Sequence, residues 1–175
     1  MKHLIIIRHA KSDWDHPGLT DFERPLNKRG RLSAPFMGEF LKSNKPMPDQ
    51  IICSAAKRTR ETCELLTHGM GIREEVSIAF KKEIYGADVS DLLEVVNKIG
   101  DDIEVTFLIG HNPGVSDVTH YLTNDDNAPS FTTCGVAHIT FDTDSWAEVS
   151  AGTGTFIDYH YPRQFPKFNE LLKNQ

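Results

Sequence analysis

The sequence predicts an α/β fold, a three-layer α/β/α sandwich around a mostly parallel sheet with an antiparallel edge. Through residues 1–122, short apolar runs alternate with segments whose apolar residues recur at helical spacing, which favours parallel strands joined by helices. Beyond residue 135 the pattern changes to short strand-like runs separated by turn residues. The chain has 175 residues, 39% apolar and 25% charged, so we expect one globular domain over residues 1–175.

The first elements are a strand, a long loop and a helix. The run His3–Ile7 is rich in β-branched residues and predicts a buried strand. The polar segment Ala10–Leu26 contains prolines and a glycine, and loops of this length in compact domains are often functional. Asn27 is a good N-cap for the helix that follows, and we expect Pro35 to kink that helix or delay its start.

The middle of the chain continues the alternation. The strands predicted here are Gln50–Cys53, Ser77–Phe80 and Thr106–Ile109. The helices predicted here are Lys57–His68 with Gly69 as its stop, a helix capped by Ser90 that ends at Gly100, and Val115–Leu122. In a parallel sheet of this kind, ligands bind at the carboxyl ends of the strands.

The last part of the chain predicts an antiparallel edge and a short closing helix. The strands predicted here are Val136–Phe141, Trp146–Val149 and Thr155–Tyr161. The helix predicted after them covers Phe168–Lys173.

Composition excludes several classes of protein. The N-terminal apolar run Leu4–Ile7 is too short for a signal peptide or a membrane span, so we expect a soluble, cytoplasmic protein with no membrane partner. Three cysteines cannot all pair within one chain and no CxxC occurs, which favours buried free thiols at Cys53, Cys63 and Cys134.

The charge is distributed unevenly along the chain. The net charge of −6 argues against non-specific nucleic-acid binding. Residues 1–60 carry 12 Lys and Arg against 6 Asp and Glu, whereas residues 61–175 carry 7 against 19. This asymmetry suggests a local anion site in the N-terminal third, although a chance imbalance on a solvated surface would look the same.

Three polar motifs each follow a predicted strand. They are Arg8-His9-Ala10-Lys11-Ser12, Ser54-Ala55-Ala56-Lys57-Arg58-Thr59 and Gly110-His111-Asn112-Pro113-Gly114. Because the carboxyl ends of parallel strands meet at one edge of a sheet, we expect the motifs to converge there. Each motif alone is compatible with a surface histidine, a solvated helix residue or an ordinary strand-to-helix turn; their joint occurrence is the informative feature.

The combined residues suit a phosphoryl group. Guanidinium groups match phosphate oxygens in pairs, and helix N-termini add N–H donors. A neutral imidazole is a competent nucleophile toward phosphorus. We expect Arg8 and Arg58 to disfavour protonation of His9 and so to keep a lone pair available on its ring.

Together, Arg8-His9, Ser54-x-x-x-Arg58 and Gly110-His111 resemble the histidine phosphatase superfamily, the phosphoglycerate mutase-like proteins. The stretch from Asp21 to Gly30, with Arg24-Pro25-Leu26, is similar to the SixA-like phosphohistidine phosphatases within it. The similarity runs from Lys2 to about Pro162 and implies a phosphoglycerate mutase-like fold.

The resemblance implies a role for each matching residue. His9 would be the nucleophile that becomes transiently phosphorylated, and Arg8 and Arg58 would clamp the phosphoryl oxygens. His111 would donate a hydrogen bond to the transferring group. Further candidate donors to the substrate are Ser12, Asn112 and Arg24, with a structural ion pair that holds the loop as the alternative for Arg24.

The chain departs from the wider superfamily in two respects. Many members have glycine after the histidine, whereas Ala10 stands here, which fits the SixA-like branch and argues against a mutase. The chain has no room for the long insertions that cover the pocket in mutases, so we expect no cap domain. Glu83 is the candidate for the carboxylic acid that protonates an alkoxide leaving group, with an exposed glutamate beside two lysines as the alternative.

We therefore expect a metal-independent phosphatase that uses nucleophilic His9 and acts on protein phosphohistidine. The arginines would supply the positive charge that a metal supplies elsewhere, and no HxH or HExxH spacing occurs, so neither a metal nor another cofactor is expected. The partner would be a phosphorylated protein or a small phosphorylated substrate. The alternatives are a small-molecule phosphomonoesterase with Glu83 as general acid and a non-catalytic phosphate-binding module.

Overall fold

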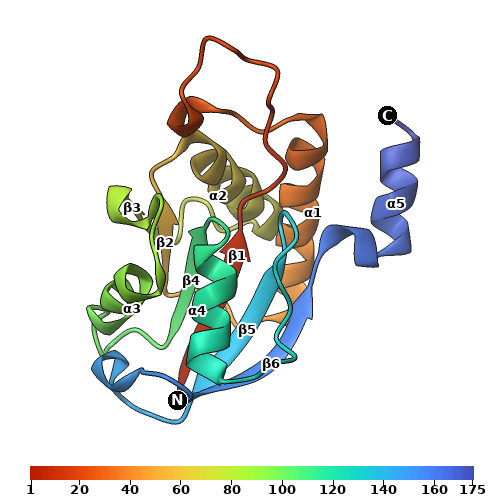
Figure 1. Ribbon diagram of the computed structural model, residues 1–175. Coiled ribbons are helices and arrows are strands. Elements are labelled where there is room, and N and C mark those ends of the chain that lie inside the picture. Colours follow the sequence, from red (N-terminus) through yellow and green to blue (C-terminus); the bar gives the residue numbers. More distant parts are fainter.

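The computed structural model describes residues 1–175 and contains one six-stranded sheet with strand order β3-β2-β4-β1-β5-β6 (Figure 1). Its strands are β1 (Lys2–Arg8), β2 (Gln50–Ser54), β3 (Ser77–Lys81), β4 (Val105–Gly110), β5 (Val136–Phe141) and β6 (Gly154–His160). The first four strands are mutually parallel, β5 is antiparallel to β1, and β6 is antiparallel to β5. The predicted mostly parallel sheet with an antiparallel edge is confirmed.

Helices cover both faces of this sheet, which confirms the predicted α/β/α sandwich (Figure 1). One face packs against α1 (Lys28–Asn44) and α2 (Lys57–Met70), and the other against α3 (Val89–Asn97) and α4 (Gly114–Thr123). A fifth helix, α5 (Pro166–Lys173), contacts the outer side of α1.

Strand β1 is buried on both faces because it lies inside the sheet. Ile5 and Ile7 belong to the core under α1 and α2, whereas Leu4 and Ile6 belong to the core under α3 and α4. All four side chains are fully buried, and burial of each contributes roughly 1.5–3 kcal/mol. A continuous apolar run is what such a strand requires.

Helix α1 begins where the sequence predicts. It starts at Lys28, where Asn27 accepts a hydrogen bond from the Gly30 N–H, and it continues through Pro35 to Asn44, so Pro35 does not delay its start.

The end of α2 differs from the prediction. Gly69 lies inside α2 rather than at its end, because α1 and α2 approach closely there. A Cβ atom on Gly69 would lie 2.3 Å from the Pro35 carbonyl oxygen. The helix ends instead at Gly71, whose φ of 72° is the left-handed conformation that glycine accepts without strain.

Two further expectations are wrong in detail. Asp88, not Ser90, caps α3: its carboxylate accepts the Asp91 N–H at 3.0 Å, and the helix ends at Asn97, before Gly100. The predicted strand Trp146–Val149 is a 3₁₀ turn over Trp146–Glu148. The Trp146 indole is buried in the core and donates its N–H to the Ile103 carbonyl at 2.7 Å.

The predicted loop Ala10–Leu26 lies above the carboxyl ends of the parallel strands (Figure 1). It contains one 3₁₀ turn, Asp21–Glu23, and it is fastened at both ends by the bridge between Ser12 and Leu26. Leu26 also donates its N–H to Glu61 of α2 at 2.7 Å. All three cysteines are buried free thiols. None of the helices combines the length and the hydropathy needed to cross a bilayer.

Candidate active site

The three motifs converge at the carboxyl ends of β1, β2 and β4, which are neighbours in the sheet. There they surround a cavity of about 220 Å³, called the phosphate pocket below. Its lining residues are Arg8, His9, Lys11, Ser12, Trp14, Arg24, Arg58, His111, Asn112 and Thr133. Four of these residues are cationic at neutral pH and none is a carboxylate, so the pocket suits an anion.

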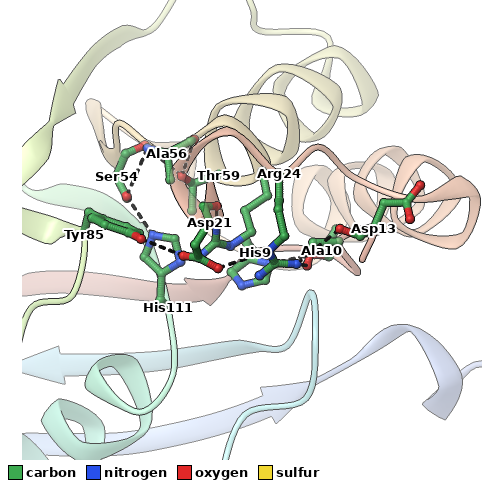
Figure 2. Close-up of polar contacts among 12 residues, drawn as sticks. His9, Ala10, Asp13, Asp21, Arg24, Ser54, Ala56, Thr59, Tyr85 and His111 are labelled. Atoms are coloured by element: carbon green, nitrogen blue, oxygen red, sulfur yellow. Dashed lines mark hydrogen bonds and ion pairs between the residues drawn. The ribbon is translucent and has the colours of Figure 1, made fainter. Parts of the chain in front are cut away.

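His9 is buried and has one ring nitrogen fixed by the backbone. Its Nδ1 lies 2.7 Å from the Ala10 carbonyl oxygen (Figure 2). Because a carbonyl only accepts, Nδ1 carries the proton and Nε2 keeps its lone pair. Burial lowers the pKa of His9 to about 3, and the positive charges of Arg58 and Arg8 act in the same direction, against the hydrogen bond to Ala10. His9 is therefore neutral at physiological pH.

His111 lies beside His9, with the ring centroids 5.2 Å apart. Its Nε2 is 2.7 Å from the Ser54 hydroxyl, which itself accepts the Ala56 N–H at 3.4 Å (Figure 2). His111 Nε2 is thus engaged with Ser54, and Nδ1 is the ring nitrogen left without a partner in the chain. Burial, reinforced by Arg58, lowers the pKa of His111 to about 4, so this residue is neutral at physiological pH.

The two clamp arginines are held by backbone carbonyls. Arg8 donates from Nη1 to the Phe131 carbonyl at 2.8 Å, and Arg58 donates from Nη1 to the Asp21 carbonyl at 2.7 Å. Three buried side-chain nitrogens have no hydrogen-bond partner within the chain: Nε of Arg8, Nε of Arg58 and Nδ1 of His111. All three belong to residues of the phosphate pocket, so the unsatisfied donors of the protein are gathered where an anion would bring acceptors.

Asp21 is a site residue that sequence reasoning left without a role. Its carboxylate accepts hydrogen bonds from Tyr85 Oη at 2.6 Å, Arg24 Nε at 3.0 Å and Arg58 Nη2 at 3.1 Å (Figure 2). The hydrogen bond from Tyr85, together with those from the arginines, lowers the pKa of Asp21 to about 2. Asp21 is an ionised anchor for Arg58 and Arg24. The spacing of Asp21 and Arg24 was a usable signal, but the contact with Tyr85 was not visible in sequence.

Arg24 and Ser12 lie in the pocket wall and also hold the loop. Arg24 donates to the Ser12 hydroxyl at 2.6 Å and is paired with Asp21, so the ion-pair alternative describes its contacts, although it also lines the pocket. Its guanidinium stacks 3.6 Å from the centroid of the exposed Trp14 ring. Neither Trp14 nor Lys11 was singled out from the sequence as a site residue.

Asn112 supports the opposite wall of the pocket. Its side-chain amide donates to the Phe131 carbonyl at 2.9 Å and accepts from the Ser116 hydroxyl at 2.7 Å. The Phe131 N–H in turn donates to Ser116 at 3.0 Å. Asn112 thus fixes the backbone carbonyl that also receives Arg8.

Glu83 is the one predicted site residue that the structure does not bring to the pocket. It follows β3 in a 3₁₀ turn, Lys82–Ile84, that buries Ile84 and turns Glu83 outward. Its side chain is 59% exposed and lies 3.6 Å from the Lys81 ammonium group. The alternative, an exposed glutamate beside lysines, describes its place in the structure.

Comparison with known proteins agrees with this arrangement. The family model of the histidine phosphatase superfamily (branch 1) matches residues 4–90. The Mycobacterium tuberculosis protein Rv1276c is 31% identical over 166 residues, which cover 90% of this chain and all of that protein.

Solved structures of SixA proteins share the fold. SixA from Agrobacterium tumefaciens superposes with a TM-score of 0.79 at 24% identity, over 92% of this chain and 98% of that one. The protein histidine phosphatase SixA complexed with tungstate gives a TM-score of 0.75 at 24% identity, over 93% and 98% of the two chains. The fold is thus that of the SixA proteins, and the chain belongs to the histidine phosphatase superfamily, branch 1.

Proposed function

We propose that the protein is a metal-independent phosphatase in which His9 is the nucleophile. Nε2 of His9 attacks phosphorus in line, so that a P–N bond forms while the bond to the leaving group breaks. Water then attacks the phosphorus of phospho-His9, inorganic phosphate leaves, and the electron pair of the P–N bond returns to Nε2. The observation that carries the proposal is the neutral His9, whose Nδ1–H is bonded to the Ala10 carbonyl and whose Nε2 lone pair is left for phosphorus.

The other pocket residues supply charge and donors for this reaction. Arg8 and Arg58 neutralise the phosphoryl oxygens, which is the role that a metal ion has in other phosphatases. His111 donates from Nδ1 to an oxygen of the transferring group, where negative charge is greatest. Asp21 keeps Arg58 in place through its carbonyl and its carboxylate.

A phosphohistidine of another protein is the substrate we propose. A sugar alkoxide needs a proton in the transition state, whereas an imidazole can be protonated before cleavage and departs readily. The pocket lining holds no carboxylic acid, Glu83 lies outside it, and the nearby Asp21 is ionised because its pKa is about 2. This inventory favours a P–N bond over the phosphoester of a sugar.

The partner we propose is a phosphorylated protein, and the compartment we propose is the cytoplasm. Three buried free thiols fit a reducing compartment. A small phosphorylated molecule is the competing substrate, and the assay below separates the two.

Phosphate release from a phosphohistidine peptide and from p-nitrophenyl phosphate in EDTA tests the proposal. We expect chelator-resistant activity on both substrates, with the peptide preferred, and loss of both activities in His9→Ala. Loss of activity in EDTA that added Mg²⁺ restores would contradict the metal-independent mechanism. A sugar phosphate assayed beside them and turned over as fast as the peptide, or faster, would contradict the proposed substrate.

The variant Glu83→Gln tests the remaining candidate acid. Because Glu83 is exposed and outside the pocket, we expect turnover of the peptide and of phosphoesters to stay within about twofold of wild type. A large loss on sugar phosphates alone would assign Glu83 the role of general acid in ester cleavage.

A further inference from the structure

A second cavity adjoins the phosphate pocket. It has a volume of about 190 Å³ and lies between the N-terminal end of α1 and the segment Tyr161–Arg163. Its lining residues are Arg29, Ser33, Thr132, Thr133, Tyr161, Pro162, Arg163 and Phe168. Thr133 lines both cavities, so they are neighbours with one residue as a common wall.

The walls of this second cavity contact the backbone of the segment that carries His9. On one side, Cys134 follows Thr133 and donates its N–H to the His9 carbonyl at 3.0 Å. On the other side, Gly30 follows Arg29 and packs so closely on Lys11 that a Cβ atom would lie 2.2 Å from the Lys11 carbonyl oxygen. The position of the second cavity relative to His9 is therefore fixed by backbone contacts.

Two guanidinium groups in this cavity lack partners. Half-buried Arg29 and exposed Arg163 form no side-chain hydrogen bond or ion pair within the chain, and no carboxylate lines the cavity. Burial and the charge of Arg163 both lower the pKa of Arg29, which places the two cations within each other's field. By contrast Arg24 and Arg58, in the phosphate pocket, are each paired with Asp21. Two uncompensated cations facing one cavity favour an anionic ligand.

The remaining lining residues suit a side chain that carries its charge on methylene groups. Phe168 and Pro162 are buried and give the cavity an apolar wall. A guanidinium pair binds the planar oxygens of a carboxylate well, and an apolar wall accepts the CH₂ groups that precede it. Glutamate and aspartate side chains have this combination.

We infer that this second cavity is an anion subsite that binds a carboxylate side chain near the phosphorylated residue of an acidic protein substrate. The inference rests on the proposed function and adds a specificity to it: the phosphoryl group occupies the phosphate pocket while a neighbouring carboxylate contacts Arg29 and Arg163 across Thr133. The cationic lining of both cavities also steers an acidic protein surface toward His9.

Paired peptides test the subsite. One set carries phosphohistidine with glutamate at one to three positions on either side, and the matched set carries glutamine there. We expect kcat/KM of wild type to be about tenfold higher for the best glutamate peptide than for its glutamine match, the size of a charge-assisted hydrogen bond. The double variant Arg29→Gln/Arg163→Gln should lose this preference.

Two controls separate a direct contact from general charge. Arg73→Gln removes an exposed arginine that is paired with Glu64 and lines neither cavity, and it should keep the full preference. Activity on p-nitrophenyl phosphate, which has one anionic group, should be unchanged in both variants.

Equal rates of wild type on the two peptide sets, with p-nitrophenyl phosphate still hydrolysed, would overturn the subsite and leave the proposed function standing. A preference that survives in the double variant would also overturn it. A sugar bisphosphate is assayed as well. If the double variant lost turnover of this substrate alone, a carboxylate would not be the ligand of the second cavity. A wild-type protein inactive on every substrate would overturn the proposed function, and the subsite with it.

Discussion

Two pairs of histidines lie in or beside β1, and only one of these pairs lines the phosphate pocket. His9 and His111 have their ring centroids 5.2 Å apart, and His3 and His138 have theirs 5.3 Å apart. Burial lowers the pKa of all four, to about 3 for His9 and to about 4 for His111 and His138. Burial alone therefore makes both pairs neutral and does not distinguish them.

The surroundings of the ring nitrogens make the difference. His3 Nδ1 lies 3.0 Å from His138 Nε2, neither ring lines the phosphate pocket, and the nearby Lys45 ammonium is already paired with Asp158 at 2.5 Å. His9 and His111 bond the Ala10 carbonyl and the Ser54 hydroxyl, and both rings line the phosphate pocket together with four cationic side chains. A neutral histidine can act as a nucleophile only where its free nitrogen faces a phosphoryl group that nearby cations bind.

The largest expected effect separates the two pairs directly. His9→Ala removes the attacking nitrogen, and we expect kcat/KM on p-nitrophenyl phosphate to fall by about 10³-fold or more. His3→Gln changes the other pair and should leave kcat/KM within about twofold, since it lines no part of the phosphate pocket. Thermal unfolding establishes that both variants are folded. A His9→Ala enzyme with near-normal turnover would refute the comparison.

Removing one pocket cation should have the next largest effect. Arg58→Gln deletes a guanidinium from the phosphate pocket, and we expect kcat/KM to fall by about 10²-fold, as for loss of one preorganised donor to a developing charge. Arg60→Gln is the matched control, because Arg60 lies on the same helix but stacks on Phe80, 4.2 Å from the ring centroid, outside the pocket. Equal losses in the two variants would indicate a general charge effect and not a clamp.

Asp21 acts through other residues, so its removal should cost less. Asp21→Asn weakens the anchor of Arg58 and Arg24, and we expect about a tenfold fall in kcat/KM, mostly through kcat, because the cations are misplaced and not removed. Asp13→Asn, in the same loop, is the control and should leave kcat/KM nearly unchanged. Activity retained in Asp21→Glu would support a positioning role. A kcat/KM of Asp21→Asn equal to that of wild type would exclude it.

The same carboxylate predicts how stability depends on pH. The pKa of Asp21 is about 2 in the folded protein, against 3.8 for an aspartate without these contacts. The contribution of Asp21 to the free energy of unfolding is therefore complete above about pH 4 and is lost as the pH falls toward 2. We expect the unfolding free energy of wild type to fall more steeply over this window than that of Asp21→Asn. Urea unfolding at a series of pH values measures this, and parallel curves would contradict the anchor.

The smallest expected effect is the response of activity to mild acid. Since His9 and His111 stay neutral down to about pH 4, kcat/KM should remain nearly constant from about pH 8 to about pH 6. An ordinary histidine in the role of His9 would become protonated near 6.5, and the rate would already fall in this range. A pH–rate profile with an acid limb near 6.5 would show that the pocket does not keep His9 neutral.

Much of the fold and most of the site could be predicted, because the relevant signals are local. A buried parallel strand needs an apolar run such as His3–Ile7, and the carboxyl ends of such strands meet at one edge, which placed Arg8, Arg58 and His111 together in advance. Each of these residues lies at the end of a strand or shortly after it, so its location depends on little else.

The features that could not be predicted depend on contacts between distant segments. In sequence, Gly69 has the pattern of a helix stop. In the structure, it allows the close approach of α2 to Pro35 of α1, a contact that the sequence does not reveal. The strand expected at Trp146 is a 3₁₀ turn whose indole bonds the distant Ile103 carbonyl, and Tyr85 completes the Asp21 anchor across 64 positions of sequence. Glu83 was positioned by spacing alone, whereas burial of the neighbouring Ile84 decides which way it faces.

The most direct test of the central claim is to trap the phosphorylated enzyme. Wild-type protein would be mixed with excess p-nitrophenyl phosphate in EDTA, quenched with base within milliseconds, digested and examined by mass spectrometry. We predict one phosphoryl group, stable to base and labile to acid, on the peptide that contains His9 and absent from His9→Ala. A phosphoryl group on another residue, or turnover with no phosphorylated enzyme and full activity in His9→Ala, would contradict the account.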